Sequence, residues 1–420
     1  MTAAQLSIMF FLQLAAIITA CRLVGLAVQR WLGQPQVVGE MIAGVLLGPS
    51  VLGLLLPQVE AALFPEESKK VLYVGAQLGV GLYMFIVGLT FDKDEFRTSA
   101  KSAVAVAFGS MAAPFAVAAL MAPWLMGIDG LFTPRVSTAQ AALFLGAAIA
   151  ITAFPMLARI IHERGIAHTK LGTLSLSSGA IGDAGAWIVV ALVLASLGEG
   201  ASLAWKAVGG GLAFAVVMIW VAPRLLRRLS DVHARHGEVG GGLLGTVLVL
   251  FLLSAFAMDA VGIHAVFGGF LLGTAMPRGA FAAELRAKLE PFTTVFLLPM
   301  FFTFSGLNTQ LQVVDNLALA GAALAILAAS ILAKGGACYL AARLTGHDHA
   351  TAMGIGALMN ARGLMELIII NIGLQSGIIE PGLFAILVVM AIVTTLMASP
   401  LFEAVYGRRA REEGREEGKV

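Results

Sequence analysis

Long apolar runs alternate with short polar connections along nearly all of the 420 residues. Most of these runs extend over about 20 residues, the length that a helix needs to cross about 30 Å of hydrocarbon. The pattern therefore predicts an all-α polytopic membrane protein with about thirteen transmembrane helices. The predicted spans lie near residues 5–28, 37–56, 70–90, 99–125, 138–162, 170–197, 202–229, 239–257, 260–276, 283–306, 315–344, 349–373 and 382–405.

Basic residues in the connections predict how these helices are oriented, because lysine and arginine collect in cytoplasmic loops. With the N-terminus outside, most basic residues fall in the cytoplasmic loops and tail. The opposite side then holds only Lys69, Lys70, Arg135 and Lys206. We therefore expect a multi-pass protein of the cell inner membrane with a cytoplasmic C-terminus. Residues 407–420 are short and charged, and we expect them to form a disordered cytoplasmic tail.

The composition fits a protein embedded in the lipid bilayer. Hydrophobic residues make up 59% of the chain and charged residues 12%, against about 25% charged in a soluble domain. A net charge of +2 gives no indication of a nucleic-acid partner. Cys21 and Cys338 both lie in apolar spans, which excludes a disulfide framework. The chain also lacks a Walker-type phosphate motif, so ATP-driven pumping has no support. We expect a transporter that is not an enzyme and that needs no cofactor.

Two predicted spans are interrupted at corresponding places. The span at 138–162 contains Pro155, which removes a backbone donor and clashes with the preceding turn. The span at 349–373 contains the polar, glycine-bearing segment 357–363 at a depth where the chain should be apolar. Paired breaks of this kind indicate an inverted repeat whose site lies at the bilayer midplane. We expect the repeats to be spans four to six and eleven to thirteen.

Asp183 is the principal candidate for chemistry. It lies within the long apolar run 174–191, beside Gly182 and Gly185. A charged side chain at that depth costs roughly 2.5–3.5 kcal/mol, so it normally faces a wet cavity and handles ions or protons. The alternative is a structural residue that caps a helix or pairs with a neighbour. A carboxylate there can hold either a proton or a desolvated Na⁺ or K⁺, and antiport requires such mutually exclusive occupancy.

Three neutral side chains are candidate ligands beside this carboxylate. Thr152 and Asn360 lie one in each break and could supply oxygen atoms, which hard cations prefer. Ser178 lies one to two turns before Asp183. Serines in membrane helices often bond their own backbone instead, so a structural role for Ser178 stays open.

Four titratable or charged residues are candidates for charge compensation or pH sensing. Lys334 lies in mid-span, where it could pair with an acid, although lysines also extend toward the interface. Arg362 and Glu366 would share a helix face, and they either take part in ion handling or neutralise each other. His264 could titrate near physiological pH. The glycines around it are equally well explained by tight helix packing.

Several motifs resemble the monovalent cation:proton antiporter-2 family, in particular the plant cation/proton exchangers and their bacterial relatives. The matching stretches are 34–53, 152–160, 262–270 and 360–373. The resemblance implies a thirteen-helix antiporter fold in which a six-helix core contains two crossed broken helices. It also implies elevator-type transport and a separate dimerisation domain.

On this basis we expect one transmembrane domain over residues 1–406. Its core helices would lie near 99–197 and 315–405, and its scaffold or dimerisation helices near 5–90 and 202–306. A homodimer is the expected assembly.

The resemblance also implies roles for single residues. Asp183 matches the ion-binding aspartate of the family, Lys334 matches the lysine opposite the site, and Thr152 and Asn360 match positions at the helix crossing. One departure is Gly182, because relatives usually carry Asp, Asn or Gln there. Gln77 and Thr90 likewise stand where relatives often carry acids. A single carboxylate favours electroneutral, one-for-one exchange.

The sequence thus predicts a secondary antiporter that exchanges Na⁺ or K⁺ for H⁺ and binds both at Asp183. Two alternatives remain open at this stage. One is a Na⁺-coupled organic solute symporter of similar inverted-repeat architecture. The other is a membrane sensor that does not transport.

Overall fold

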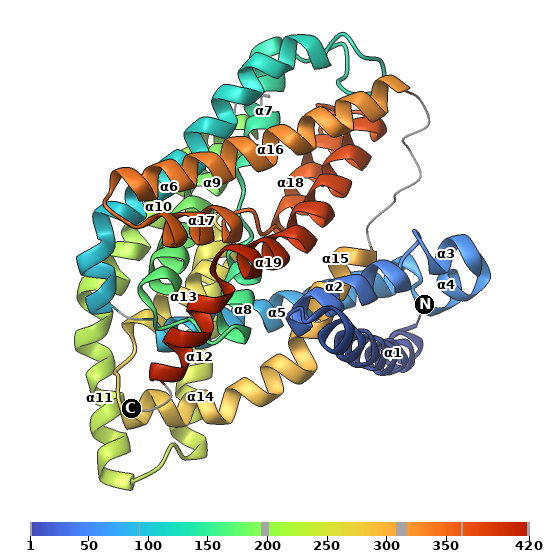
Figure 1. The fold of residues 1–420 in the computed structure, drawn as a ribbon. Helices are drawn as coiled ribbons and strands as arrows, with labels where there is room; N and C mark the ends of the chain where they lie inside the picture. The colour runs from blue at the N-terminus through green and yellow to red at the C-terminus, as the bar shows by residue number, and fades with distance from the viewer. Residues whose placement is uncertain (1, 92, 195–200, 308–316, 363, 418–420) are drawn as a thin grey trace.

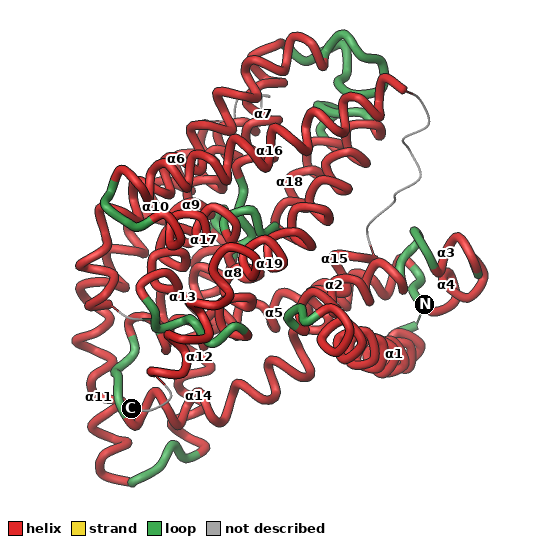
Figure 2. The backbone as a smooth tube through the Cα atoms, in the orientation of Figure 1, coloured by secondary structure: helices red, strands yellow, loops and turns green. Residues whose placement is uncertain are grey.

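The computed structural model describes residues 2–91, 93–194, 201–307, 317–362 and 364–417 (Figure 1). These residues form helices joined by loops, with one isolated bridge between Phe132 and Ile379 (Figure 2). The α-helices are α1 Ala3–Leu32, α2 Gln36–Leu47, α3 Leu52–Leu55, α4 Pro57–Leu63, α5 Glu66–Thr90, α6 Lys93–Leu125, α7 Thr138–Ala150, α8 Phe154–Glu163, α9 Lys170–Leu194, α10 Ala201–Val216, α11 Ala222–His236, α12 Gly241–Ala260, α13 Ala265–Ala275, α14 Ala280–Phe292, α15 Leu298–Leu307, α16 Leu317–Leu344, α17 His349–Leu358, α18 Leu364–Gln375 and α19 Pro381–Glu417. Two π-helical turns, η2 Val217–Val221 and η3 Thr293–Leu297, continue α10 and α14.

The all-α polytopic prediction is confirmed. Within the described residues, nine helices are long and apolar enough to cross a membrane, and α13 is a shorter apolar helix. Each of the thirteen predicted spans contains at least one helix, while the number of crossings itself stays a prediction. Residues 195–197 and 315–316, at the ends of two predicted spans, lie outside the described residues. The expected disorder of the tail is wrong for residues 407–417, because α19 is helical through Glu417.

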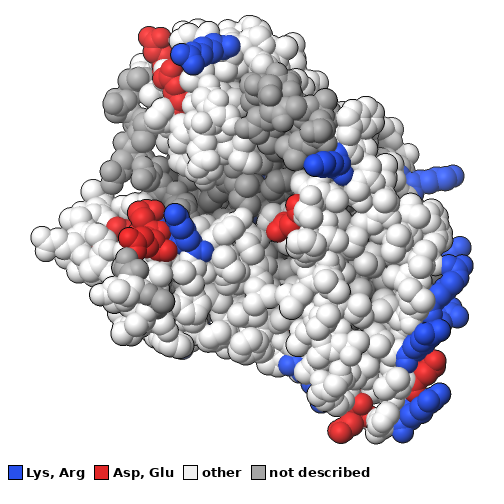
Figure 3. Space-filling model, turned by 180° about the vertical axis from the view of Figure 1, so that it is seen from behind, with Lys and Arg blue, Asp and Glu red and all other residues white. Residues whose placement is uncertain are grey.

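The outer surface is suited to lipid. Phe11, Leu120 and Trp205 are 68%, 81% and 75% exposed, which would be costly in water. Most of the face in Figure 3 carries no charged side chain. Basic side chains gather at its lower right edge, over α11. The exposed arginines of this helix are Arg224, Arg227, Arg228 and Arg235.

The helices pack in two groups. The first, which we call the core group, is α6, α7, α9, α16, α17 and α19. The second, the scaffold group, is α1, α2, α5, α12, α13 and α15. Figure 1 shows α6, α7 and α16 together in its upper part and α1, α2 and α15 at its lower right. Helix α8 contacts both groups, since it packs on α9 and also on α2 and α5.

Glycines allow the closest helix contacts, as is usual in membrane bundles. A Cβ atom on Gly88 of α5 would lie 2.3 Å from the carbonyl oxygen of Phe270 on α13. A Cβ on Gly273 of α13 would lie 2.2 Å from the carbonyl oxygen of Phe85. Backbone therefore meets backbone along the α5–α13 pair, and neither position has room for a side chain.

This packing predicts the outcome of Gly88→Ala. The added methyl group meets a backbone carbonyl that cannot rotate away, so we expect overpacking to cost about 1–3 kcal/mol. Thermal unfolding of the detergent-solubilised protein should then begin several degrees lower. Gly336→Ala is the matched control, because nothing lies within 4 Å of a Cβ at Gly336. Equal melting of Gly88→Ala and the parent protein would contradict this account of the α5–α13 contact.

Candidate ion-binding site

Both predicted helix breaks are present. Residues 151–153 separate α7 from α8, and α17 ends at Leu358 while α18 begins at Leu364. The backbone N–H of Ala153 donates to the carbonyl oxygen of Ala361 at 3.1 Å. The hydroxyl of Thr152 lies 3.4 Å from the carbonyl oxygen of Met359 and donates to it. The two breaks therefore lie against each other inside the bundle, where Figure 2 shows loop segments surrounded by helices.

Cationic side chains from the second half of the chain satisfy the carbonyl groups at the end of α7. Arg362 donates to the carbonyl oxygens of Ala148 at 2.9 Å and Ile149 at 2.7 Å. The ammonium group of Lys334 donates to the carbonyl oxygen of Ala150. The last carbonyls of a helix have no partner within the helix and carry partial negative charge. Lys334 and Arg362 supply the hydrogen bonds that the break of α7 would otherwise leave unmade.

Arg362 is also paired within its own half of the chain. Its Nη1 lies 3.2 Å from Oε1 of Glu366, and both side chains are fully buried. Arg362 therefore links Glu366, in the first turn of α18, to the end of α7. Whether the pair also takes part in ion handling stays a prediction. Glu366 Oε2 is a buried acceptor for which the described residues provide no hydrogen bond.

Asp183 lies on α9 beside the first break, and it is 1% exposed. Its carboxylate interacts electrostatically with Lys334 and with the backbone N–H of Phe154, at the N-terminal end of α8. Neither oxygen makes a full hydrogen bond to the described residues. A helix N-terminus favours an anion, so the carboxylate is placed at a favourable end of a half-helix while its oxygens stay available.

Gly179 explains how α8 comes so close to this carboxylate. It lies one turn before Asp183 on the same face of α9. A Cβ atom at Gly179 would lie 2.7 Å from Cδ2 of Leu157 on α8. The missing side chain lets α8 lie against α9, which brings the start of α8 to Asp183.

Asn360 and Thr152 supply further oxygen atoms at the crossing. Asn360 donates through Nδ2 to the carbonyl oxygen of Gly356 at 2.9 Å, and its buried Oδ1 has no partner among the described residues. The Thr152 hydroxyl keeps its lone pairs while donating to Met359. Thr152 and Asn360 thus bring oxygen atoms, which hard cations prefer, to the crossing beside which Asp183 lies.

Ser178 does not share a helix face with Asp183. Its hydroxyl is buried and has no partner among the described residues. Five residues separate it from Asp183, and in a helix that spacing turns the side chain by about 140°. Ser178 therefore lies on a different face of α9 from the carboxylate.

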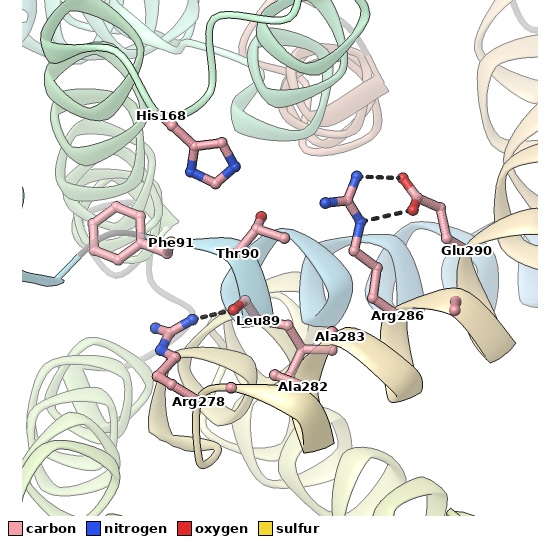
Figure 4. A pocket seen from close by; sticks show the side chains of 11 residues that line it. Leu89, Thr90, Phe91, His168, Arg278, Ala282, Ala283, Arg286 and Glu290 are labelled. Atoms are coloured by element: carbon pink, nitrogen blue, oxygen red, sulfur yellow. Dashed lines mark hydrogen bonds and ion pairs between the residues drawn. The ribbon is translucent and has the colours of Figure 1, made fainter. Parts of the chain in front are cut away.

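A cavity of about 700 Å³ opens between α5, α14 and the loop before α9. Figure 4 shows the Thr90 side chain pointing into it, between His168 and Arg286. Arg286 is paired with Glu290 at 2.7 Å, and Arg278 donates to the carbonyl oxygen of Leu89. The cavity lies at the edge of the scaffold group, on the side that we expect to be cytoplasmic.

Comparison with known proteins identifies the family of this arrangement. Residues 16–405 match the family model for the transmembrane part of sodium/hydrogen exchangers. The chain belongs to this family. The Na⁺/H⁺ antiporter NhaS4 of Synechocystis is 37% identical over 393 residues, which are 93% of this chain and 95% of that protein. Cation/H⁺ antiporter 18 of Arabidopsis thaliana is 33% identical over 96% of this chain, which spans about half of that longer protein.

A solved structure supports the fold independently. The sodium proton antiporter MjNhaP1 of Methanocaldococcus jannaschii superimposes with a TM-score of 0.65. The match covers 96% of this chain and 98% of that chain, at 16% identity. Family membership and antiporter fold, both predicted from the motifs, are thus confirmed.

His264 has a structural position in this exchanger fold. It is the N-cap residue of α13, where its Nδ1 accepts the backbone N–H of Val266 at 3.3 Å. The neighbouring Asp259 accepts the N–H of Ala265 at 2.9 Å. These contacts belong to the scaffold group and favour the packing alternative, while pH sensing by His264 stays a prediction.

Two residues at the crossing were not predicted. Thr395 of α19 accepts the backbone N–H of Arg362 at 3.0 Å and donates to its carbonyl oxygen at 2.9 Å, which fixes the second break. The polar pair at 394–395 in an apolar run was the available signal. Ser110 of α6 has its Oγ 3.5 Å from where a Cβ of Gly182 would lie. A hydroxyl group thus stands beside Gly182, where the family resemblance led us to expect a polar side chain.

The buried network predicts a large effect for Arg362→Met. The change removes the donors to two carbonyls and leaves the Glu366 carboxylate buried without its partner, so we expect a loss of about 3–5 kcal/mol. The variant should either express poorly or unfold in detergent at a much lower temperature than the parent protein. The double variant Arg362→Met/Glu366→Met should recover part of the loss, because it leaves no unpaired charge. An Arg362→Met single variant that melts like the parent protein would refute this interpretation.

Proposed function

We propose that this protein is a secondary active antiporter that exchanges Na⁺ or K⁺ for H⁺. The observation that carries the proposal is the buried carboxylate of Asp183, which lacks full hydrogen bonds and lies beside two broken helices. The names of relatives support the ion classes. They include a Na⁺/H⁺–K⁺ antiporter of Bacillus cereus, 28% identical, and a K⁺/H⁺ antiporter of Saccharomyces cerevisiae, 30% identical.

In this proposal Asp183 binds one monovalent cation or one proton at a time. Thr152 and Asn360 contribute oxygen atoms to the cation, and freed backbone carbonyls complete its coordination. Lys334 lies near enough to interact with Asp183, so it balances the carboxylate charge when the site is empty. Since residue 182 is glycine, one acid serves each cycle, and the exchange is electroneutral.

Alternating access follows from the two packing groups. The core group, with α8 and α18, moves as a body against the scaffold group and carries Asp183 from one side to the other. The core corresponds to residues near 99–197 and 315–405, and the scaffold near 5–90 and 202–306 forms the contact of a homodimer. The protein lies in the inner membrane with its N-terminus outside and its C-terminus in the cytoplasm.

Asp183→Asn tests the shared site. The amide cannot exchange a proton for a cation, so proteoliposomes with this variant should keep an imposed proton gradient when Na⁺ or K⁺ is added. The parent protein should dissipate the gradient with at least one of the two cations and not with choline. Asp259→Asn is the matched control, because Asp259 caps α13 in the scaffold group, and it should retain exchange. Normal exchange by a folded Asp183→Asn protein would reject the proposal.

Membrane potential tests the stoichiometry. A potential of 100 mV acts on each net charge moved with about 2.3 kcal/mol, enough to change a rate more than tenfold. For one-for-one exchange, we expect the initial rate of Na⁺-driven or K⁺-driven proton flux at this potential to stay within about twofold of the rate without a potential. A steep dependence on voltage would show that net charge moves and would assign an additional proton to the cycle, for which Lys334 is the nearest candidate.

A further inference from the structure

A charged cluster crosses the boundary between α8 and the scaffold helices. Arg159 of α8 has its Nε 2.6 Å from Oε1 of Glu163 and its Nη2 4.0 Å from Oε1 of Glu40 on α2. Its guanidinium carbon lies 6.0 Å from the ring centroid of Tyr83 on α5. The backbone N–H of Val37, at the start of α2, donates to Glu163 at 3.4 Å. One end of α8 is therefore held to α2 and α5 by charge.

Glu40 depends on this cluster for its charge balance. Its side chain is 1% exposed, and neither carboxylate oxygen makes a hydrogen bond to the described residues. Arg159 is the cation that acts on it most strongly; Arg22 acts more weakly, and Glu163 acts in the opposite sense. A buried carboxylate without a partner costs several kcal/mol. The main counter-charge for Glu40 of the scaffold group is thus Arg159, which lies on a helix that also packs on the core group.

Helix α8 also reaches the ion site with its other end. Its first residue, Phe154, presents its N–H to Asp183, and Arg159 lies five residues farther along the same helix. Within one uninterrupted ten-residue helix the two ends move together. Any shift of the core group that carries Asp183 therefore also moves Arg159 relative to Glu40.

We propose that Glu40 and Arg159 form a latch that holds the core group against the scaffold in the conformation seen here. This inference rests on the proposed alternating-access transport. When the core shifts, Arg159 leaves Glu40 behind in an apolar setting, so the latch stabilises one state over the other. Every 1.4 kcal/mol of such a bias changes the ratio of the two states about tenfold. Glu40 and Arg159 are positioning residues: they set the speed of the conformational change and do not touch the transported ion.

Transport kinetics provide the first test, with Glu40→Gln, Arg159→Gln and the double variant in proteoliposomes. We expect the maximal exchange rate to change at least fivefold in each, while the half-saturating cation concentration stays within about twofold. The double variant should resemble a single variant, because both changes remove one contact. Glu60→Gln is the matched control, since Glu60 of α4 pairs with Lys69 of α5 at 3.8 Å, away from α8. This variant should leave both kinetic parameters unchanged.

A transport-independent readout of the conformation is the second test. Thr90 lines the cavity between α5, α14 and the loop before α9 (Figure 4). A Thr90→Cys reporter should react with a water-soluble maleimide at a rate that depends on how the core sits on the scaffold. The native Cys21 and Cys338 are buried, so their background should be small. We expect Glu40→Gln to change the labelling rate of the reporter at least threefold, and Glu60→Gln to leave it unchanged.

The two readouts separate this inference from the proposed function. If the parent protein exchanges no cation but Glu40→Gln still alters labelling, the latch stands and the antiport proposal fails. Unchanged labelling and unchanged maximal rate in folded Glu40→Gln or Arg159→Gln protein would overturn the latch. A change confined to the half-saturating concentration would overturn it as well, because that result assigns Glu40 to ion binding. If Glu40→Gln does not fold, Arg159→Gln tests the same contact from the other side.

Discussion

Burial of a carboxylate without full hydrogen bonds is the constraint on which the rest of this structure depends. Asp183 lies in an apolar bundle that would ordinarily exclude its charge. Two features make the charge tolerable: the N-terminal end of α8 faces it, and Lys334 lies near it. The first feature requires the interruption between α7 and α8 at residues 151–153, since a continuous helix would have no free N–H groups at that depth.

The interruption creates a cost that the second repeat offsets. Breaking one helix leaves carbonyls without partners, and Arg362 and Lys334 supply the missing donors from the other half of the chain. The first repeat in turn provides the Thr152 hydroxyl for the carbonyl of Met359. Each break therefore makes hydrogen bonds that the other would leave unmade.

Much of this arrangement could be predicted from local patterns. The length of the apolar runs predicted the helices, and Pro155 and the polar segment before Gly363 predicted the two breaks. Asp183 was a candidate because it is an acid within an apolar run. The partners of Arg362 and Lys334 could not be predicted, because they are backbone carbonyls about 200 residues away. Likewise, nothing local in the sequence indicates that the counter-charge of Glu40 is Arg159. The tail failed as a prediction because acids follow arginines at helical spacing, as in Arg408 and Glu412, which favours a continued helix.

Whether cation and proton share one carboxylate can be measured as proton release on cation binding. The purified protein in weakly buffered detergent solution, with a pH-indicating dye, is titrated with NaCl or KCl and with choline chloride as control. With a shared carboxylate, we expect saturation with the transported cation to release up to one proton per chain, and we expect no release from Asp183→Asn. Saturable cation binding without proton release, or equal release from Asp183→Asn, would contradict a carboxylate shared by cation and proton.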